Sequence, residues 1–476
     1  MKNNKELYIK LVFWTLWTAL VAMCTYYIIH NAQWLIGDDA IVIRHTGFGK
    51  AFLPSDTVSP SSGRFYPFAY LVYDILLLFG GDHISPTAHY VLQAVLFVLF
   101  VVSVTCLTLV VLENQKAIWK YSISLMVAVV FIGRVYPQYT ECFSTAWFGY
   151  SVLAVFMLCV YLFYKKQKWI YGIIALLCIS YNCYCVESAF VLPLSFGMCS
   201  FLFQRKTQTS KEKVFNWCLV GSALLFLVLY SALILPYIKS AYDSAHGTDV
   251  GYVENAVKMI WAQKLLLLAL VIFVIRLVDM LRNKRKYTIY DNLLMTAAAC
   301  CFGNFMLRLN WTLYYNSAAL LVIPPILYFS IHYLKEKWTL VLFVLLALFY
   351  GRKIPTTIQK NQEDRFGVAR DVDALSERID AVSAVYWYAP KPNEGSYGMV
   401  LDEWMYVSLC TYLGWLKYDS EFAIPREKDF RAKENTIWLK YVGNEQLNTA
   451  DNCLEENGEL IFDSSCIKGF YINHTE

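Results

Sequence analysis

Long apolar runs recur along the whole chain, and they constrain its fold more than any other feature. A helix needs about 20 consecutive apolar residues to cross a bilayer, and many of the runs approach that length. With 58% hydrophobic and 16% charged residues, 476 residues offer too little polar surface for a soluble protein. We therefore predict an all-α polytopic membrane protein whose main partner is the lipid bilayer. A net charge of +4 gives no reason to expect a nucleic acid partner.

The apolar runs predict about eleven transmembrane helices. Their expected positions are near residues 11–29, 88–112, 121–136, 147–164, 169–186, 188–203, 214–236, 264–281, 289–307, 313–334 and 338–351. The gaps between them fall into two sets that alternate along the chain. One set holds 18 lysines and arginines in 40 residues, whereas the other holds 6 in 84. The positive-inside rule places the first set, and with it the N-terminus, in the cytoplasm of an inner or plasma membrane.

Two segments are placed by this alternation of sides. The run 65–81 is apolar but short, and a crossing there would move every later lysine-rich gap to the outside. We therefore predict that it lies at the interface or re-enters within a first outer loop, residues 30–87. The run 169–203 has basic gaps at both ends, so it has to cross twice, with a turn near "NCYCVES".

The tail, residues 352–476, changes character because charges, prolines and glycines break up the apolar pattern. It predicts a small α/β domain outside the membrane, following a transmembrane domain of residues 1–351. "ARDVDALSERIDAV" has the spacing of an amphipathic helix, whereas "AVYWYA", "TIWLKYV" and "GFYIN" have the composition of strands. Cys453 and Cys466 are the best candidates for a disulfide, which an oxidising compartment would permit; two unpaired thiols are the alternative.

Charged residues at a membrane edge are costly, and they often mark functional sites. Several of them lie at the predicted outer ends of helices, where a bundle could gather them around one cavity. These residues are Asp38, Asp39, Arg44, Asp56, Arg64, Arg134, Glu141, Glu187 and Arg308.

Their chemistry suits a phosphate-activated lipid substrate. Paired carboxylates such as Asp38 and Asp39 offer a general base, a metal site or both. Arginine forks match phosphate oxygens, which makes Arg44, Arg64 and Arg308 the candidates for binding a donor phosphate. Structural alternatives remain open at this stage. The acidic pair could cap the following helix, and the arginines could anchor helix ends at the interface.

The first outer loop also resembles a known class of enzymes. "GDDA" (37–40) followed by "IR", and later "SGRFYPF" (62–68), is similar to GtrII-type glucosyltransferases of the GT-C superfamily of integral-membrane glycosyltransferases. The architecture resembles this class over residues 1–350, whereas the motifs cover only about 35 residues of the loop. The C-terminal domain resembles no family that we can name.

The resemblance implies a polyprenyl-phosphate-linked sugar donor and transfer to a cell-envelope glycan or lipid acceptor on the outer side. It implies that Asp38 is the catalytic base, with Asp39 as the second choice, and that Arg44 and Arg64 contact the phosphate. Some GT-C enzymes need a divalent metal such as Mg or Mn, and the sequence leaves this open.

Two other functions are compatible with this sequence. An O-antigen polymerase or ligase would depend on outer arginines and histidines, and a lipid-linked glycan flippase would need charges near mid-bilayer in matched halves. The charges cluster at one edge and no matched halves are visible, so the transferase is the favoured hypothesis.

Overall fold

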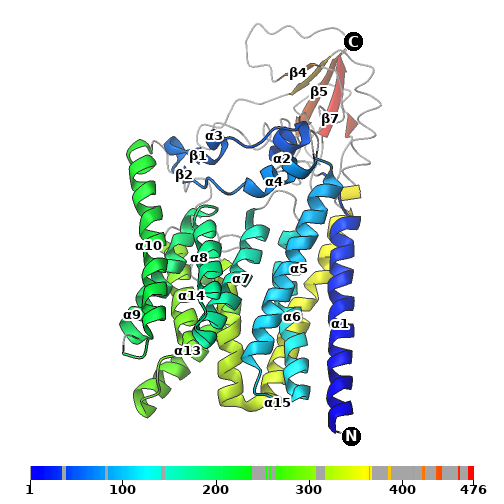
Figure 1. Ribbon diagram of the computed structural model, residues 1–476. Helices are drawn as coiled ribbons and strands as arrows, with labels where there is room; N and C mark the ends of the chain where they lie inside the picture. Colours follow the sequence, from blue (N-terminus) through cyan, green and yellow to red (C-terminus); the bar gives the residue numbers. More distant parts are fainter. Residues whose placement is uncertain are drawn as a thin grey trace.

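The fold is a bundle of apolar helices with a polar layer at one end, seen in a computed structural model (Figure 1). The structure describes residues 2–34, 39–80, 84–140, 145–204, 206–238, 254, 257–258, 261, 264–306, 317–363, 365–366, 384–387, 411, 421–423, 436–441, 459–460 and 470–475. The predicted helix within 369–382 lies outside these residues.

The described helices coincide with the predicted spans. They are α1 (Lys2–His30), α5 (Pro86–Val111), α6 (Ala117–Tyr139), α7 (Thr145–Lys166), α8 (Trp169–Cys183), α9 (Val191–Gln204), α10 (Ser210–Leu233), α13 (Lys264–Asn283), α14 (Ile289–Met306) and α15 (Ile323–Gly351). Lys335 has a left-handed φ of 62° and breaks α15, which accounts for the two spans predicted on either side of it. Within the described residues, six helices are long and apolar enough to cross a membrane. They mark an integral membrane protein.

A polar layer covers the end of the bundle opposite the N-terminus (Figure 1). It contains α2 (Asp39–His45), α3 (Pro54–Thr57), the paired strands β1 (Val58–Ser59) and β2 (Arg64–Phe65), and α4 (Leu71–Gly80). We name it for the charged residues that it carries, such as Asp39 and Arg64, although α4 itself is mostly apolar. With 10 residues, α4 is about 15 Å long and cannot cross a hydrocarbon core of about 30 Å. We call this end of the bundle the loop end and the opposite one the N-terminal end.

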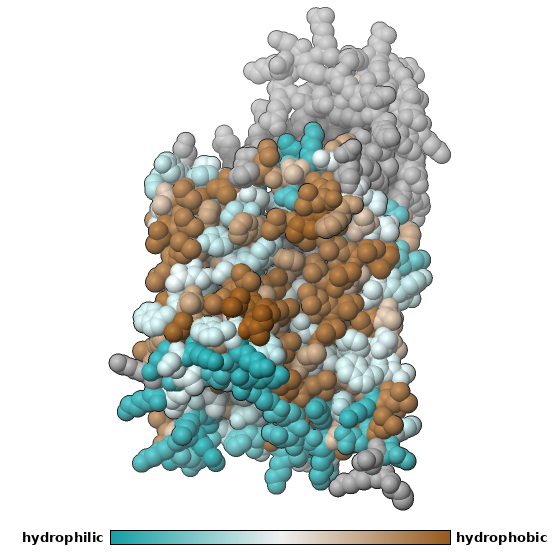
Figure 2. Space-filling model, in the orientation of Figure 1, coloured by the Kyte–Doolittle hydropathy of each residue, from teal (hydrophilic) through white to brown (hydrophobic). Residues whose placement is uncertain are grey.

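The surface has the pattern of a membrane protein. Figure 2 shows a broad apolar zone over the bundle, with hydrophilic residues gathered at the N-terminal end. The two short helices α8 and α9 pass between these ends with a tight turn, which contains the 3-10 helix Glu187–Phe190. The run 169–203 therefore forms two short apolar helices joined by a turn, as predicted, whereas its double crossing of the membrane stays a prediction.

The tail contains a five-stranded mixed sheet with the order β4-β3-β5-β7-β6. Its strands are β3 (Ala384–Trp387), β4 (Glu421–Ala423), β5 (Thr436–Tyr441), β6 (Glu459–Leu460) and β7 (Phe470–Thr475). β3 pairs in parallel with β4 and β5, whereas β7 pairs antiparallel with β5 and β6. The three predicted strands are β3, β5 and β7, and Figure 1 draws β5 and β7 beyond the loop end.

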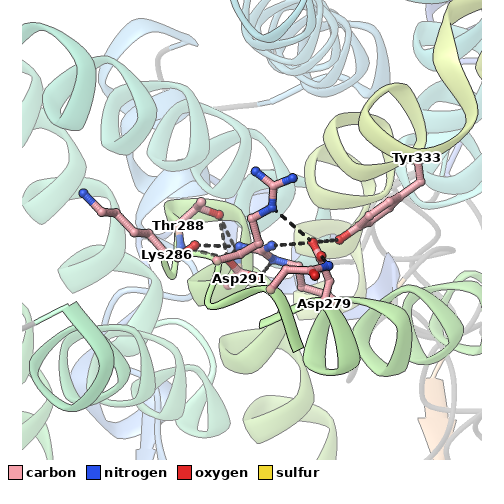
Figure 3. A network of polar contacts seen from close by, with 8 residues as sticks. Asp279, Lys286, Thr288, Asp291 and Tyr333 are labelled. Carbon is pink, nitrogen blue, oxygen red and sulfur yellow. Dashed lines mark hydrogen bonds and ion pairs between the residues drawn. The ribbon is translucent and has the colours of Figure 1, made fainter. Parts of the chain in front are cut away.

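A buried ion-pair network holds α13, α14 and α15 together toward the N-terminal end (Figure 3). Arg276 donates from Nε and Nη2 to the carboxylate of Asp291, at 2.8 and 3.1 Å, and from Nη2 to the Lys286 carbonyl at 2.6 Å. Asp279 accepts from Arg276 Nη1 at 3.3 Å and from the Tyr333 hydroxyl at 2.8 Å. Every charge in this network has a partner, so its contacts indicate a structural role.

The closest helix packing that bears on the site is between α6 and α15. A Cβ atom added to Gly133 would lie 2.3 Å from the backbone carbonyl oxygen of Tyr350. We expect Gly133→Ala to lower the free energy of unfolding by about 1–3 kcal/mol, because the two backbones would have to separate. Gly221→Ala is the control, since nothing lies within 4 Å of its added Cβ. Equal unfolding midpoints for the two variants in detergent would contradict this packing.

Candidate functional site

The second carboxylate of the acidic pair starts a helix of the polar layer. Asp39 is the first residue of α2, and it is only 5% exposed. Val42 and Ile43 of the same helix enter the main apolar core, which fixes the helix against the bundle. Arg44 is exposed. Asp39 is therefore a buried carboxylate at the rim of an apolar bundle, and Asp38 lies outside the described residues.

A histidine and a carboxylate stabilise the layer next to α2. The His45 ring stacks on Phe52 with centroids 4.1 Å apart, and the Asp74 carboxylate accepts a hydrogen bond from the Phe52 N–H at 2.8 Å. Burial lowers the pKa of His45 and raises the pKa of Asp74. In both groups, burial works against the charged form.

Arg64 belongs to a separate part of the polar layer. Its guanidinium lies 4.4 Å from the centroid of the Tyr66 ring. The preceding Gly63 has a φ of +77°, and its carbonyl accepts a hydrogen bond from the Tyr230 hydroxyl of α10 at 2.9 Å. Phe65 packs with residues of α8 and α10 in a small second core. The "SGRF" turn is therefore fixed over α8 and α10, whereas α2 is fixed over the main core.

Arg134 is buried between helices below the loop end. It lies in α6 with 8% of its surface exposed, and its Nη1 donates to the Tyr350 hydroxyl of α15 at 3.3 Å. The guanidinium is also 5.2 Å from the centroid of the same ring. Arg134, which was predicted at the outer edge, therefore makes a buried contact between α6 and α15.

Three basic residues that the sequence analysis did not select gather near Arg134. Arg134, Lys264 and Arg352 all act electrostatically on Lys353. Lys264 starts α13, whereas Arg352 and Lys353 directly follow α15. One signal could have found them: they lie at predicted outer ends of spans, where the positive-inside rule disfavours basic residues.

A further buried cation joins the segment after α15 to the first helix. Arg365 is 1% exposed, and its Nη1 donates to the backbone carbonyl of Asn31 at 2.5 Å. Its guanidinium lies 4.3 Å from the centroid of the Tyr90 ring in α5. These contacts fix the start of the tail against α1 and α5, directly below the polar layer.

Several predicted site residues are not placed by the structure. Arg308, Glu141, Cys453 and Cys466 lie outside the described residues, as does Asp38. Glu187 begins the 3-10 helix between α8 and α9. Among the described residues, no three His, Cys, Asp or Glu side chains gather closely enough to hold a metal ion.

Comparison with known proteins places the fold. No protein-family profile and no curated protein sequence matches the chain. The structure is similar to the crystal structure of ArnT from Cupriavidus metallidurans in the apo state, with a TM-score of 0.51 and 9% sequence identity. The likeness covers 96% of this chain and 97% of that one.

The chain therefore has the fold of the ArnT structure. The likeness extends over nearly all of both chains, so it includes the polar layer as well as the bundle. At this sequence identity it establishes the architecture alone.

Proposed function

We propose that the protein is a GtrII-type glycosyltransferase that uses a polyprenyl-phosphate-linked sugar. The observation that carries this proposal is the buried Asp39 carboxylate, in a polar layer over one end of an apolar bundle with the GT-C fold. A lipid carrier can lie along such a bundle while its phosphate and sugar reach the polar layer at the end. The acceptor in this proposal is a cell-envelope glycan or lipid.

The loop end is the extracytoplasmic end in this proposal. The N-terminus lies at the opposite end, together with the hydrophilic surface seen in Figure 2. The positive-inside rule assigns the lysine-rich end to the cytoplasm. The polar layer and the C-terminal sheet then lie outside, where lipid-linked sugars for the cell envelope would be used.

The proposed reaction is a displacement at the anomeric carbon of the sugar. Asp38 or Asp39 takes the proton of an acceptor hydroxyl, and the hydroxyl oxygen attacks the anomeric carbon. The bond between that carbon and the phosphate oxygen breaks, and polyprenyl phosphate leaves with the electron pair. Arg44, Arg64 and Arg308 are proposed to neutralise the negative charge of the departing phosphate.

Donor choice is the direct test of this function. Purified protein in proteoliposomes should release sugar from a hexosyl polyprenyl phosphate and should leave the matching nucleotide sugar intact. The nucleotide lacks the apolar chain that would lie along the bundle. Radiolabelled donors of both kinds, separated by chromatography, measure the difference. Equal turnover of the two donors, or turnover of the nucleotide sugar alone, would contradict the proposal.

A further inference from the structure

Three basic side chains surround two aromatic rings at the loop end of α13 and α15. Lys264 Nζ lies 4.6 Å and Arg352 Cζ 4.9 Å from the centroid of the Phe349 ring. Lys353 Nζ lies 5.9 Å from the centroid of the neighbouring Tyr350 ring. Lys264 is far in sequence from the adjacent pair Arg352 and Lys353, and all three residues are exposed. We call Lys264, Arg352 and Lys353 the basic cluster.

The basic cluster is an unneutralised concentration of positive charge. Within the described residues, none of its three members forms an ion pair with a carboxylate. Aromatic faces attract cations weakly and carry no net charge, so the repulsion within the cluster persists. A bound anion would remove it.

The surroundings of the basic cluster indicate which anion would fit. From Lys264 onward, α13 exposes a row of apolar side chains that nothing in the described bundle covers: Leu267, Leu270, Val271, Val274 and Val278. Trp261 precedes the cluster with 71% of its surface exposed, in the manner of an interfacial aromatic anchor. An anion bound here would have an apolar surface directly beside it, as the phosphate of a membrane lipid does.

We propose that the basic cluster binds the phosphate group of a membrane lipid. The site is separate from Arg64, because Arg64 is fixed over α8 and α10, whereas the cluster lies at the start of α13 and just after α15. This step rests on the glycosyltransferase function proposed above, in which the donor phosphate lies in the polar layer. A second phosphate site would then bind the acceptor, so the acceptor would be a phosphate-bearing lipid.

Lipid binding by the full-length protein tests the site without any assay of transfer. Native mass spectrometry would count bound undecaprenyl phosphate, phosphatidylglycerol or phosphate-free undecaprenol. A triple variant, Lys264→Gln, Arg352→Gln and Lys353→Gln, should bind at least one of the two phosphate lipids about 10- to 100-fold more weakly. Its binding of undecaprenol should equal that of the wild type. The phosphate lipid that shows the loss identifies the ligand.

A matched control removes the same charge at the opposite end of the bundle. Lys116, Lys206 and Lys213 are exposed there, and their triple change to glutamine should leave lipid binding as in the wild type. Wild-type binding of both phosphate lipids by the cluster variant would overturn the proposal, as would an equal loss in the control. If millimolar inorganic phosphate displaced the bound phosphate lipid as strongly as added lipid does, the proposal of a lipid site would also be overturned. Asp38→Asn and Asp39→Asn should bind normally, which separates this site from the proposed reaction.

Discussion

Replacing the catalytic member of the acidic pair by asparagine is expected to lower sugar transfer by about 100- to 10,000-fold, the usual contribution of a general base. Asparagine keeps the size and the hydrogen-bonding oxygen of aspartate but does not take up the acceptor proton at neutral pH. Asp38→Asn and Asp39→Asn therefore test the charge at each position separately. Steady-state transfer rates with a hexosyl polyprenyl phosphate donor provide the measurement.

The same substitutions separate catalysis from helix capping. Asparagine favours helix starts about as well as aspartate, so α2 should remain formed and the unfolding midpoint should change little. Asp56→Asn is the control within the polar layer, because Asp56 accepts a hydrogen bond from the Leu53 N–H at 2.7 Å, a role that an amide oxygen can take. Wild-type transfer by both Asp38→Asn and Asp39→Asn would rule out the acidic pair as the base.

Removing the charge of Arg276 is expected to destabilise the protein by about 3–5 kcal/mol, because Asp291 would remain buried without its partner. Arg276 is 4% exposed and Asp291 is 3% exposed, so water cannot replace the lost contacts. Arg276→Met keeps most of the side-chain volume and removes the charge. Equilibrium unfolding in mixed micelles would give the difference in free energy.

An exposed ion pair provides the control for this prediction. Glu113 and Lys165 form a salt bridge with their side chains 43% and 32% exposed, so Glu113→Gln should cost less than about 1 kcal/mol. Arg276→Met combined with Asp291→Leu should recover part of the loss, since no buried charge would remain unpaired at Asp291. Equal costs for Arg276→Met and Glu113→Gln would show that the network in Figure 3 contributes little to stability.

The helices could be predicted because crossing a bilayer requires long apolar segments, and these are visible as continuous runs in the sequence. The break at Lys335 and the turn before Val191 followed from the alternation of basic gaps. The strand pairing in the tail could not be predicted. The parallel contact of β3 with β5 joins segments about 50 residues apart, and no local pattern specifies such a partner.

The site was only partly predictable. Arg134 was selected because it is a charge near the end of a span, and it does make a buried contact with Tyr350. Lys264, Arg352 and Lys353 were passed over because basic residues beside spans usually signal topology. Arg365 gave no signal, since its burial against Asn31 and Tyr90 depends on the path of the chain after α15. These residues come close to their partners only when distant segments pack together, and the local sequence pattern does not show that packing.

A structure with a hexosyl polyprenyl phosphate bound would test the central claim most directly. We predict that the sugar and the phosphate lie in the polar layer at the loop end, with an acidic-pair carboxylate facing the anomeric carbon and Arg44 or Arg64 contacting the phosphate. A donor bound at the N-terminal end, or one held only by the basic cluster with the polar layer unoccupied, would contradict it.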